Sequence, residues 1–214
     1  QAYSYLAFTI SHFVFLGFSK NSEGDIKKAK FYVEKALDCD NRDSLAHEML
    51  ARIYSLSKNH DQAVEAAKKA IECNVNSSSA YMFYASALTF ANRCEEALEP
   101  IDQAIKLSPR DPRTFNFLMN KAMIVGEMGD LKLSVDLARK AVAIPQGDFR
   151  PALILAIYCA KSGLLDEAQK AIERVLEIIP NFTLTKLKEN FFSHFETKLL
   201  DNYVLNLSKL DVPK

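Results

Sequence analysis

The sequence predicts an all-α fold, a right-handed α-solenoid of about five helix-turn-helix repeats with a C-terminal helical cap. The first observation is a small residue that recurs at spacings of 34, 34, 37 and 34 residues. The second is that two further small or apolar positions, three and seven residues earlier, repeat with the same spacings. Together they form an i, i+4, i+7 stripe on one helix face in every unit. A period in this range is typical of stacked supersecondary units. The stripe residues are Ala29, Val33, Ala36; Ala63, Ala67, Ala70; Ala97, Ile101, Ala104; Ser134, Ala138, Ala141; and Ala168, Ile172, Val175.

Each stripe belongs to the second helix of a unit, because a first apolar segment and a short polar turn precede it. The predicted units cover about 2–41, 42–75, 76–109, 110–146 and 147–180. The first has a longer internal turn, Ser19–Asp25. The stripe of the fourth unit comes three residues late. We expect the extra residues to add about one helical turn to its first helix, within Pro112–Met128, since a turn takes about 3.6 residues.

Residues 181–214 do not continue the repeat, but they are too apolar for an exposed tail. Two helical pieces are predicted, Leu184–Phe192 and Phe195–Leu210. The last unit of a solenoid needs a cap over its apolar face. We therefore expect this segment to provide that cap.

The repeat resembles the tetratricopeptide repeat, a helix-turn-helix unit of about 34 residues. The resemblance depends on the stripe and on first-helix positions such as Phe13-x-x-Leu16-Gly17 and Tyr81-x-x-Tyr84-Ala85. The chain has no tryptophan, so the family's usual aromatic opener is Phe or Tyr here. The resemblance implies a curved solenoid that binds proteins or peptides on its concave surface.

Composition limits the class of partner. Lys plus Arg equals Asp plus Glu at 27 each, so the net charge is zero. A general phosphate-backbone binder needs an excess of basic residues, so we expect no direct nucleic-acid binding. The apolar segment Tyr3–Phe18 is too short and too polar for a span of about 20 residues, and we predict core there and no membrane association.

The four cysteines do not form a close pair or a Cys-x-x-Cys motif. Cys39 and Cys73 share one slot in adjacent units, and Cys159 lies on an apolar first-helix stripe, so all three are predicted to pack as small apolar side chains. Cys94 lies in a turn, where we expect it to be exposed. Reduced thiols fit a cytoplasmic protein.

Sequence motifs for catalysis are missing. The six glycines form no phosphate-binding pattern, and the four histidines are isolated from one another. Acidic pairs such as Glu95-Glu96 begin second helices, where the positive end of the helix dipole stabilises carboxylates. We therefore expect no catalytic residues, no metal site, no cofactor and no enzymatic activity in these residues.

The concave face offers the candidate binding residues. Asn116 and Asn120 are four apart, and their amides could hydrogen-bond an extended peptide backbone. Arg113 and Arg150 could pair with a carboxylate. The lysine and asparagine clamp of the family's chaperone-tail binders is missing, so chaperone-tail binding is not expected. The predicted partner-binding residues are Glu48, Arg52, Met82, Ser86, Arg113, Asn116, Asn120, Arg150 and Leu153.

A further resemblance is to the C-terminal repeat region of bacterial signalling proteins, chiefly class III adenylate/guanylate cyclases and winged-helix transcriptional regulators. The residues that carry it are Cys73–Ser77, Ala91–Ala97, Ile105–Phe115, Ile179–Leu184 and Leu207–Pro213. It implies a regulatory module C-terminal to a cyclase domain. Two alternatives stay open: a signal-sensing region of a DNA-binding regulator, and a self-association scaffold that forms a homodimer. The chain begins with Gln1, and we expect it to be a fragment of a longer protein.

Overall fold

The computed structural model describes residues 1–145 and 147–213, and these residues form helices and no strands. The predicted boundary residues Gln146 and Lys214 lie outside them. Ten helices form five consecutive pairs, as the all-α prediction requires. The pairs are α1 (Ala2–Phe15) with α2 (Ser22–Cys39), α3 (Ser44–Leu56) with α4 (His60–Cys73), α5 (Ser78–Phe90) with α6 (Cys94–Leu107), α7 (Thr114–Glu127) with α8 (Leu131–Ala143), and α9 (Arg150–Lys161) with α10 (Leu165–Ile178).

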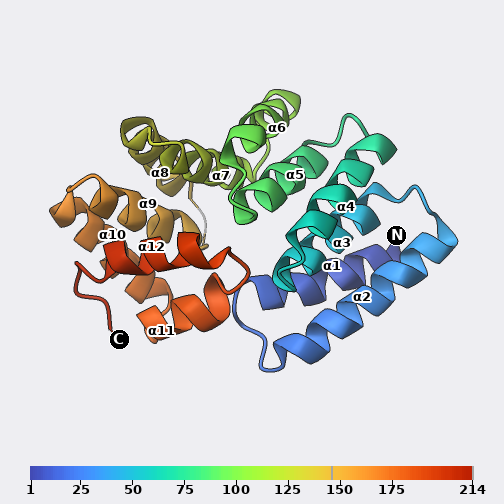
Figure 1. Cartoon of the computed structure of the whole chain (residues 1–214), viewed down its shortest axis with the longest axis horizontal. Coiled ribbons are helices and arrows are strands. Elements are labelled where there is room, and N and C mark those ends of the chain that lie inside the picture. The colour runs from blue at the N-terminus through green and yellow to red at the C-terminus, as the bar shows by residue number, and fades with distance from the viewer. Residues whose placement is uncertain (146, 214) are drawn as a thin grey trace.

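The pairs stack side by side along an arc (Figure 1). Each first helix contacts the first helix of the next pair, so α1, α3, α5, α7 and α9 form a continuous inner row. Each second helix contacts the first helix of the following pair and lies on the outer side of the arc. The concave face is therefore built from the first helices.

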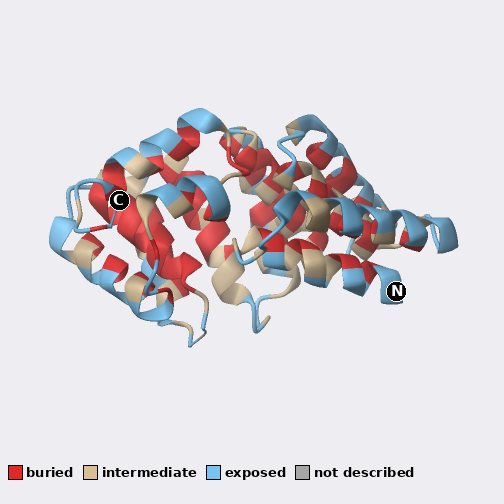
Figure 2. Cartoon of the chain, turned by 90° about the horizontal axis from the view of Figure 1, so that it is seen from below, coloured by how far each residue is buried: buried red, intermediate tan, exposed pale blue. Residues whose placement is uncertain are grey.

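The stripe predicted from the sequence is the contact surface between the two helices of each pair. All fifteen of its residues are at most 2% exposed. Small side chains at these positions let neighbouring helices approach closely. Figure 2 shows the result as buried faces turned inward along the whole arc, with exposed residues on its outside.

Each first helix ends in the same way. The second residue after the helix has a positive φ in all five units, at Gly17, Lys58, Asn92, Gly129 and Gly163. The N–H group of the next residue donates to a carbonyl five positions back, as in Arg93 N to Leu88 O at 2.8 Å. This is a Schellman C-cap, which satisfies carbonyls at the helix end. Glycine occupies this left-handed position in three units. Lysine and asparagine occupy it in the other two, where their side chains make the left-handed conformation sterically costly.

The fourth unit differs from its prediction. Its first helix, α7, has 14 residues and α5 has 13, so the expected extra turn in this helix is wrong. The remaining extra residues lie before α7, in a loop over residues 108–113, where Pro109 and Pro112 do not favour helix. The insertion therefore lengthens the loop before α7 more than it lengthens α7 itself.

The C-terminal segment covers the last pair and then reaches back to the first. It consists of α11 (Leu184–Lys186), the π-helical turn η1 (Leu187–Phe191) and α12 (Thr197–Leu207). Helix α12 packs on α9, and the Tyr158 and Tyr203 hydroxyls are 2.8 Å apart. The turn η1 contacts α1. At Gly17 a β-carbon would lie 2.7 Å from the Phe191 ring, so glycine permits this close approach.

Residues 192–196 complete the closure between the two ends of the chain. The His194 ring lies 4.9 Å from Phe15 and 4.6 Å from Phe90, measured between centroids. Glu196 N donates to Phe90 O at 3.2 Å. The C-terminal segment thus joins α1 and α5, which belong to the first and third units. A cap over the last unit alone would not make these contacts.

The cysteine predictions are partly wrong. Cys159 is fully buried as expected, but Cys39 is exposed and Cys73 is only partly buried. Cys94 is buried at 8% exposure, because the turn residue predicted to be exposed is the first residue of α6 and faces the core. Within the described residues, no helix is long and apolar enough to cross a bilayer.

Candidate functional site

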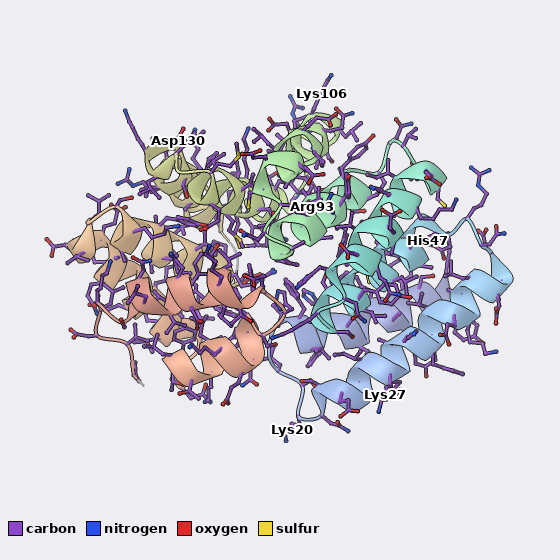
Figure 3. All side chains as sticks on the ribbon, in the orientation of Figure 1. Lys20, Lys27, His47, Arg93, Lys106 and Asp130 are labelled. Atoms are coloured by element: carbon purple, nitrogen blue, oxygen red, sulfur yellow. The ribbon has the colours of Figure 1, made fainter. Side chains whose placement is uncertain are left out.

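A cavity of about 290 Å³, the central cavity, lies on the inner side of the arc, between the first helices and residues 192–195. Charged side chains labelled in Figure 3, among them Lys20, Lys106 and Asp130, lie at the outer edges of the molecule, away from it. The residues that line it come from α1, α3, α5, α7, the start of α9 and the C-terminal segment. They are Phe8, His12, Phe15, Ala51, Arg52, Ser55, Met82, Phe83, Ser86, Ala87, Phe90, Arg113, Phe115, Asn116, Met119, Asn120, Met123, Asp148, Arg150, Ile154, Phe192 and Phe195.

Seven phenylalanines line the central cavity. Phe8 and Phe15 are one heptad apart on α1, and Phe83 and Phe90 have the same spacing on α5. This spacing puts each pair on one helix face. Phe195 from the C-terminal segment packs against Phe90 with ring centroids 4.7 Å apart. The packing of these two rings thus holds the C-terminal segment against α5 at the cavity.

Arg52 extends into this aromatic environment from α3. Its Cζ atom lies 4.7 Å from the ring centroid of Phe83, 5.2 Å from that of Phe8 and 5.4 Å from that of Phe15. The side chain as a whole is partly exposed, but Nε and Nη1 are inaccessible to solvent and have no hydrogen-bond partner among the described residues. Burial, together with repulsion from Arg150, lowers the pKa of Arg52 to about 9. The group remains a cation at neutral pH.

The two other arginines that line the central cavity are paired. Arg150 donates from Nε to both carboxylate oxygens of Asp148 at 3.0 and 2.9 Å, and from Nη2 to the same carboxylate. Burial opposes ionisation of Asp148, but the Arg150 hydrogen bonds prevail and lower its pKa. Arg113 donates to Asp111 from Nε and Nη2, both at 3.1 Å. Arg52 forms no such ion pair among the described residues, and its charge is attracted by Glu48, one turn earlier on α3.

The asparagines predicted to bind a peptide line the central cavity but form internal hydrogen bonds. Asn120 Oδ1 accepts from Ser86 Oγ at 2.9 Å, and Asn120 Nδ2 donates to Asn116 O at 2.8 Å. Asn116 Oδ1 accepts from Arg150 Nη2 at 3.2 Å. These amides connect α5, α7 and the start of α9. Only part of their hydrogen-bonding capacity is left for a ligand.

Two of the nine predicted binding residues do not line the central cavity. Glu48 is 3% exposed and accepts from Ser77 Oγ and Ser79 Oγ at 3.1 and 2.8 Å, so it ties α3 to the start of α5. Burial raises its pKa despite these hydrogen bonds. Leu153 is fully buried in the core of the last pair, and its expected place on the open face is wrong. Helix α9 is buried on nearly all sides because α12 covers it, which the repeat pattern did not reveal.

His12 is the titratable group of the central cavity on α1. Its ring stacks on Phe8 at a centroid distance of 5.4 Å, and its Nδ1 atom is buried without a hydrogen-bond partner in the described part of the chain. Burial, with smaller contributions from Arg52 and Arg150, lowers the pKa of His12 to about 4. The ring is therefore neutral at pH 7.

Sequence reasoning missed the aromatic residues of the site. Phe8, Phe15, Phe83 and Phe90 carry a signal, because two first helices repeat phenylalanine at heptad spacing. Phe192 and Phe195 carry none, since they follow the last repeat and reach the central cavity only through the closure. Among the described residues, no group of three or more His, Cys, Asp or Glu side chains could hold a metal ion. The arrangement offers apolar contact and cationic charge.

Comparisons with known proteins agree with this architecture. Residues 46–74 match the family model "Tetratricopeptide repeat". The fold is similar to that of PilW, described as a widely conserved type IV pilus biogenesis factor, with a TM-score of 0.70, 18% identity and coverage of 98% of this chain and 93% of that one. It is also similar to TTC0263 of Thermus thermophilus, a tetratricopeptide-repeat protein, with a TM-score of 0.67, 19% identity and coverage of 93% and 99%.

A third solved structure, YrrB, is described as a tetratricopeptide-repeat protein with an unusual peptide-binding site; it has a TM-score of 0.53, 16% identity and coverage of 84% of this chain and 86% of that one. No curated protein sequence is significantly similar to the chain. The comparisons give no support for a resemblance to cyclases or winged-helix regulators. One repeat thus carries the family's sequence pattern, and the whole chain has the fold of a tetratricopeptide-repeat protein.

Proposed function

We propose that the chain is a noncatalytic interaction module that binds a segment of a partner protein on its concave face. The observation that carries this proposal is the central cavity, which combines apolar rings with Arg52, a cation whose Nε and Nη1 atoms are buried and which forms no ion pair among the described residues. Solenoids of helix pairs commonly bind partners on their concave surfaces. Aromatic, methionine and arginine side chains are also the types enriched at protein interfaces.

Site-specific cross-linking tests this proposal. A photoreactive phenylalanine analogue replaces Met82, which lines the central cavity and is partly exposed. The matched control carries the same group at Lys106, which is exposed on α6. In a lysate of the source organism, we expect defined cross-linked peptides from Met82 and few from Lys106. Equal cross-linking at both positions, or none at Met82, would contradict the proposal.

The wider context stays a prediction. Attachment to an adenylate/guanylate cyclase and attachment to a winged-helix regulator follow from the sequence resemblance described above, and homodimer formation is the separate alternative left open there. The coding sequence upstream of Gln1 distinguishes the first two. Light scattering on the purified chain tests the third, because a dimer has twice the mass of this 24.1 kDa chain. A cytoplasmic location is likewise a prediction.

A further inference from the structure

The central cavity is lined by three arginines, and Arg52 differs from the other two in lacking a carboxylate partner among the described residues. Arg113 and Arg150 each form hydrogen bonds to an aspartate that begins the same turn. Arg52 has two inaccessible donors without a partner in the described part of the chain. A buried donor without a partner destabilises the fold, and a charged one does so more strongly. The aromatic rings around Arg52 offset part of this cost through cation–π attraction, but they accept no conventional hydrogen bond.

None of the nearby carboxylates among the described residues accepts a hydrogen bond from the Arg52 guanidinium. Glu48 lies one turn earlier on the same helix, but its carboxylate accepts from Ser77 and Ser79 instead. Asp148 is bound by Arg150. No ion pair joins Arg52 to an acidic side chain among the described residues. The donors at Arg52 therefore suit an anion that comes from outside the chain.

The walls around Arg52 define what carries that anion. Phe8, Phe15 and Phe83 surround the guanidinium, and Met82 lies on the same helix as Phe83. A single unpaired cation balances one negative charge, whereas a phosphate ester carries nearly two and stays strongly hydrated. Carboxylates also match the guanidinium donors in geometry. A volume of about 290 Å³ lies at the small end of ligand pockets, so one ring or one short chain fills it.

We propose that the central cavity binds an apolar monocarboxylate, with Arg52 as its counter-ion and the phenylalanine rings around its apolar part. Two sources have this chemistry: a free small organic acid, and the C-terminal residue of a protein segment with an apolar side chain. For the second source, the inference rests on the proposed function. Binding would connect α1, α3 and α5 through one ligand.

Calorimetric titration of the whole chain tests this inference with three matched probes. These are 3-phenylpropionate, the neutral 3-phenylpropan-1-ol, and a hexapeptide that ends in phenylalanine, with either a free or an amidated C-terminus. We expect the free carboxylate forms to bind at least about tenfold more tightly than the alcohol or the amide, because only the carboxylate adds charge attraction and two parallel hydrogen bonds to the cationic guanidinium. Binding of phenylpropionate identifies a free acid as sufficient. Binding of the peptide acid alone identifies a protein C-terminus.

Arg52→Met retains most of the apolar volume and removes the charge, so we expect it to weaken carboxylate binding at least about tenfold and to leave the weak affinity for the alcohol unchanged. The control is Arg139→Met, an arginine that pairs with Glu167 on the outer surface, and it should bind like the unmodified chain. If Arg52→Met does not fold, the Nε–H resonance of Arg52 in the unmodified chain gives the same answer, since it should shift with the acid and not with the alcohol.

Three results would overturn the inference: no carboxylate probe binds, the acid and its neutral form bind equally, or the Arg52 resonance does not respond to the acid. Failure of this inference is distinguishable from failure of the proposed function. Defined cross-links from Met82 without any carboxylate preference would support a protein partner on the concave face and contradict carboxylate binding at Arg52. A carboxylate preference without cross-links would support carboxylate binding at Arg52 and contradict the protein partner.

Discussion

The second-helix stripe and the inner face of the first helices follow opposite rules. The stripe repeats in all five units, and its small or β-branched side chains are almost completely buried in each. The inner face differs from unit to unit: Arg52 on α3 has no partner among the described residues, Ser86 bonds to Asn120 from α5, and Arg150 pairs with Asp148 at α9. Positions that repeat therefore hold the units together, and positions that do not repeat distinguish this chain from other solenoids.

The largest expected effect comes from breaking the stripe. Ile172 is fully buried between α9 and α10, so Ile172→Ala should lower the free energy of unfolding by about 3–4 kcal/mol through lost burial and a residual cavity. Ile178 ends the same helix at 38% exposure, and Ile178→Ala should cost less than about 1 kcal/mol. Urea unfolding followed by circular dichroism measures both. Similar losses at the two positions would show that the stripe has no special role.

On the inner face, the free energy of unfolding should change differently when an arginine with a carboxylate partner is replaced and when Arg52 is replaced. Arg150→Met removes the guanidinium from the buried Asp148 carboxylate and should cost about 3 kcal/mol. Arg52→Met removes a cation without a carboxylate partner among the described residues and should leave stability nearly unchanged or raise it by about 1 kcal/mol. Both variants are compared in urea unfolding without added ligand. Equal destabilisation would mean that Arg52 has a structural partner.

Acid should weaken the closure between the C-terminal segment and the first and third units. His194 is 1% exposed, and neither of its ring nitrogens has a hydrogen-bond partner within residues 1–145 and 147–213. Burial, with repulsion from His60, Arg150, Arg52 and Lys58, lowers its pKa to about 3. The unfolded chain then binds more protons than the folded one between that value and about 6.5, so stability falls as pH decreases through this window.

At pH 5 the loss from His194 should reach about 2 kcal/mol relative to pH 7. His194→Leu keeps an apolar side chain of similar volume and should show a smaller loss by about that amount. His12 and His60, whose pKa values are also lowered mainly by burial, keep a residual pH dependence in the variant. The measurement is the urea midpoint at both pH values. The same loss in the variant and the unmodified chain would exclude His194 as the source.

The smallest effect belongs to the turns. Lys58 adopts a φ of 59° where three other units place glycine. Lys58→Gly should raise the free energy of unfolding by about 0.5–1 kcal/mol, because glycine has no steric cost in this conformation. Gly129→Ala is the reverse test, since its φ is 98° and no atom lies within 4 Å of an added β-carbon. A higher melting temperature for Gly129→Ala would contradict the role of backbone conformation.

Repetition explains how far the sequence predicts the molecule. The stripe from Ala29 to Val175 predicts five helix pairs and their contact faces, because each unit repeats the same local constraint. The same register on the first helices predicts that Arg52 lies on the inner face, where it lines the central cavity. Leu153 was misplaced because α12 covers α9, and this contact depends on residues beyond the repeats.

The contacts of residues 194 and 195 with the first and third units could not be predicted for a related reason. His194 contacts Phe15 and Phe195 contacts Phe90, and no periodicity records contacts between residues so far apart in the sequence. Cys39 shows the limit within a repeat, since it is exposed whereas Cys73, in the same slot of the next unit, is partly buried. Local pattern thus fixes the units, and long-range packing fixes the site.

The contact of His194 with Phe15 has a consequence for how the molecule comes apart. An open array of repeats unfolds by fraying from its ends, because each unit depends only on its neighbours. Here the C-terminal segment contacts both the first and the third unit, so the first pair cannot separate from the array without losing its contacts with this segment. We therefore expect these contacts to break before, or together with, the separation of the first pair when the chain unfolds.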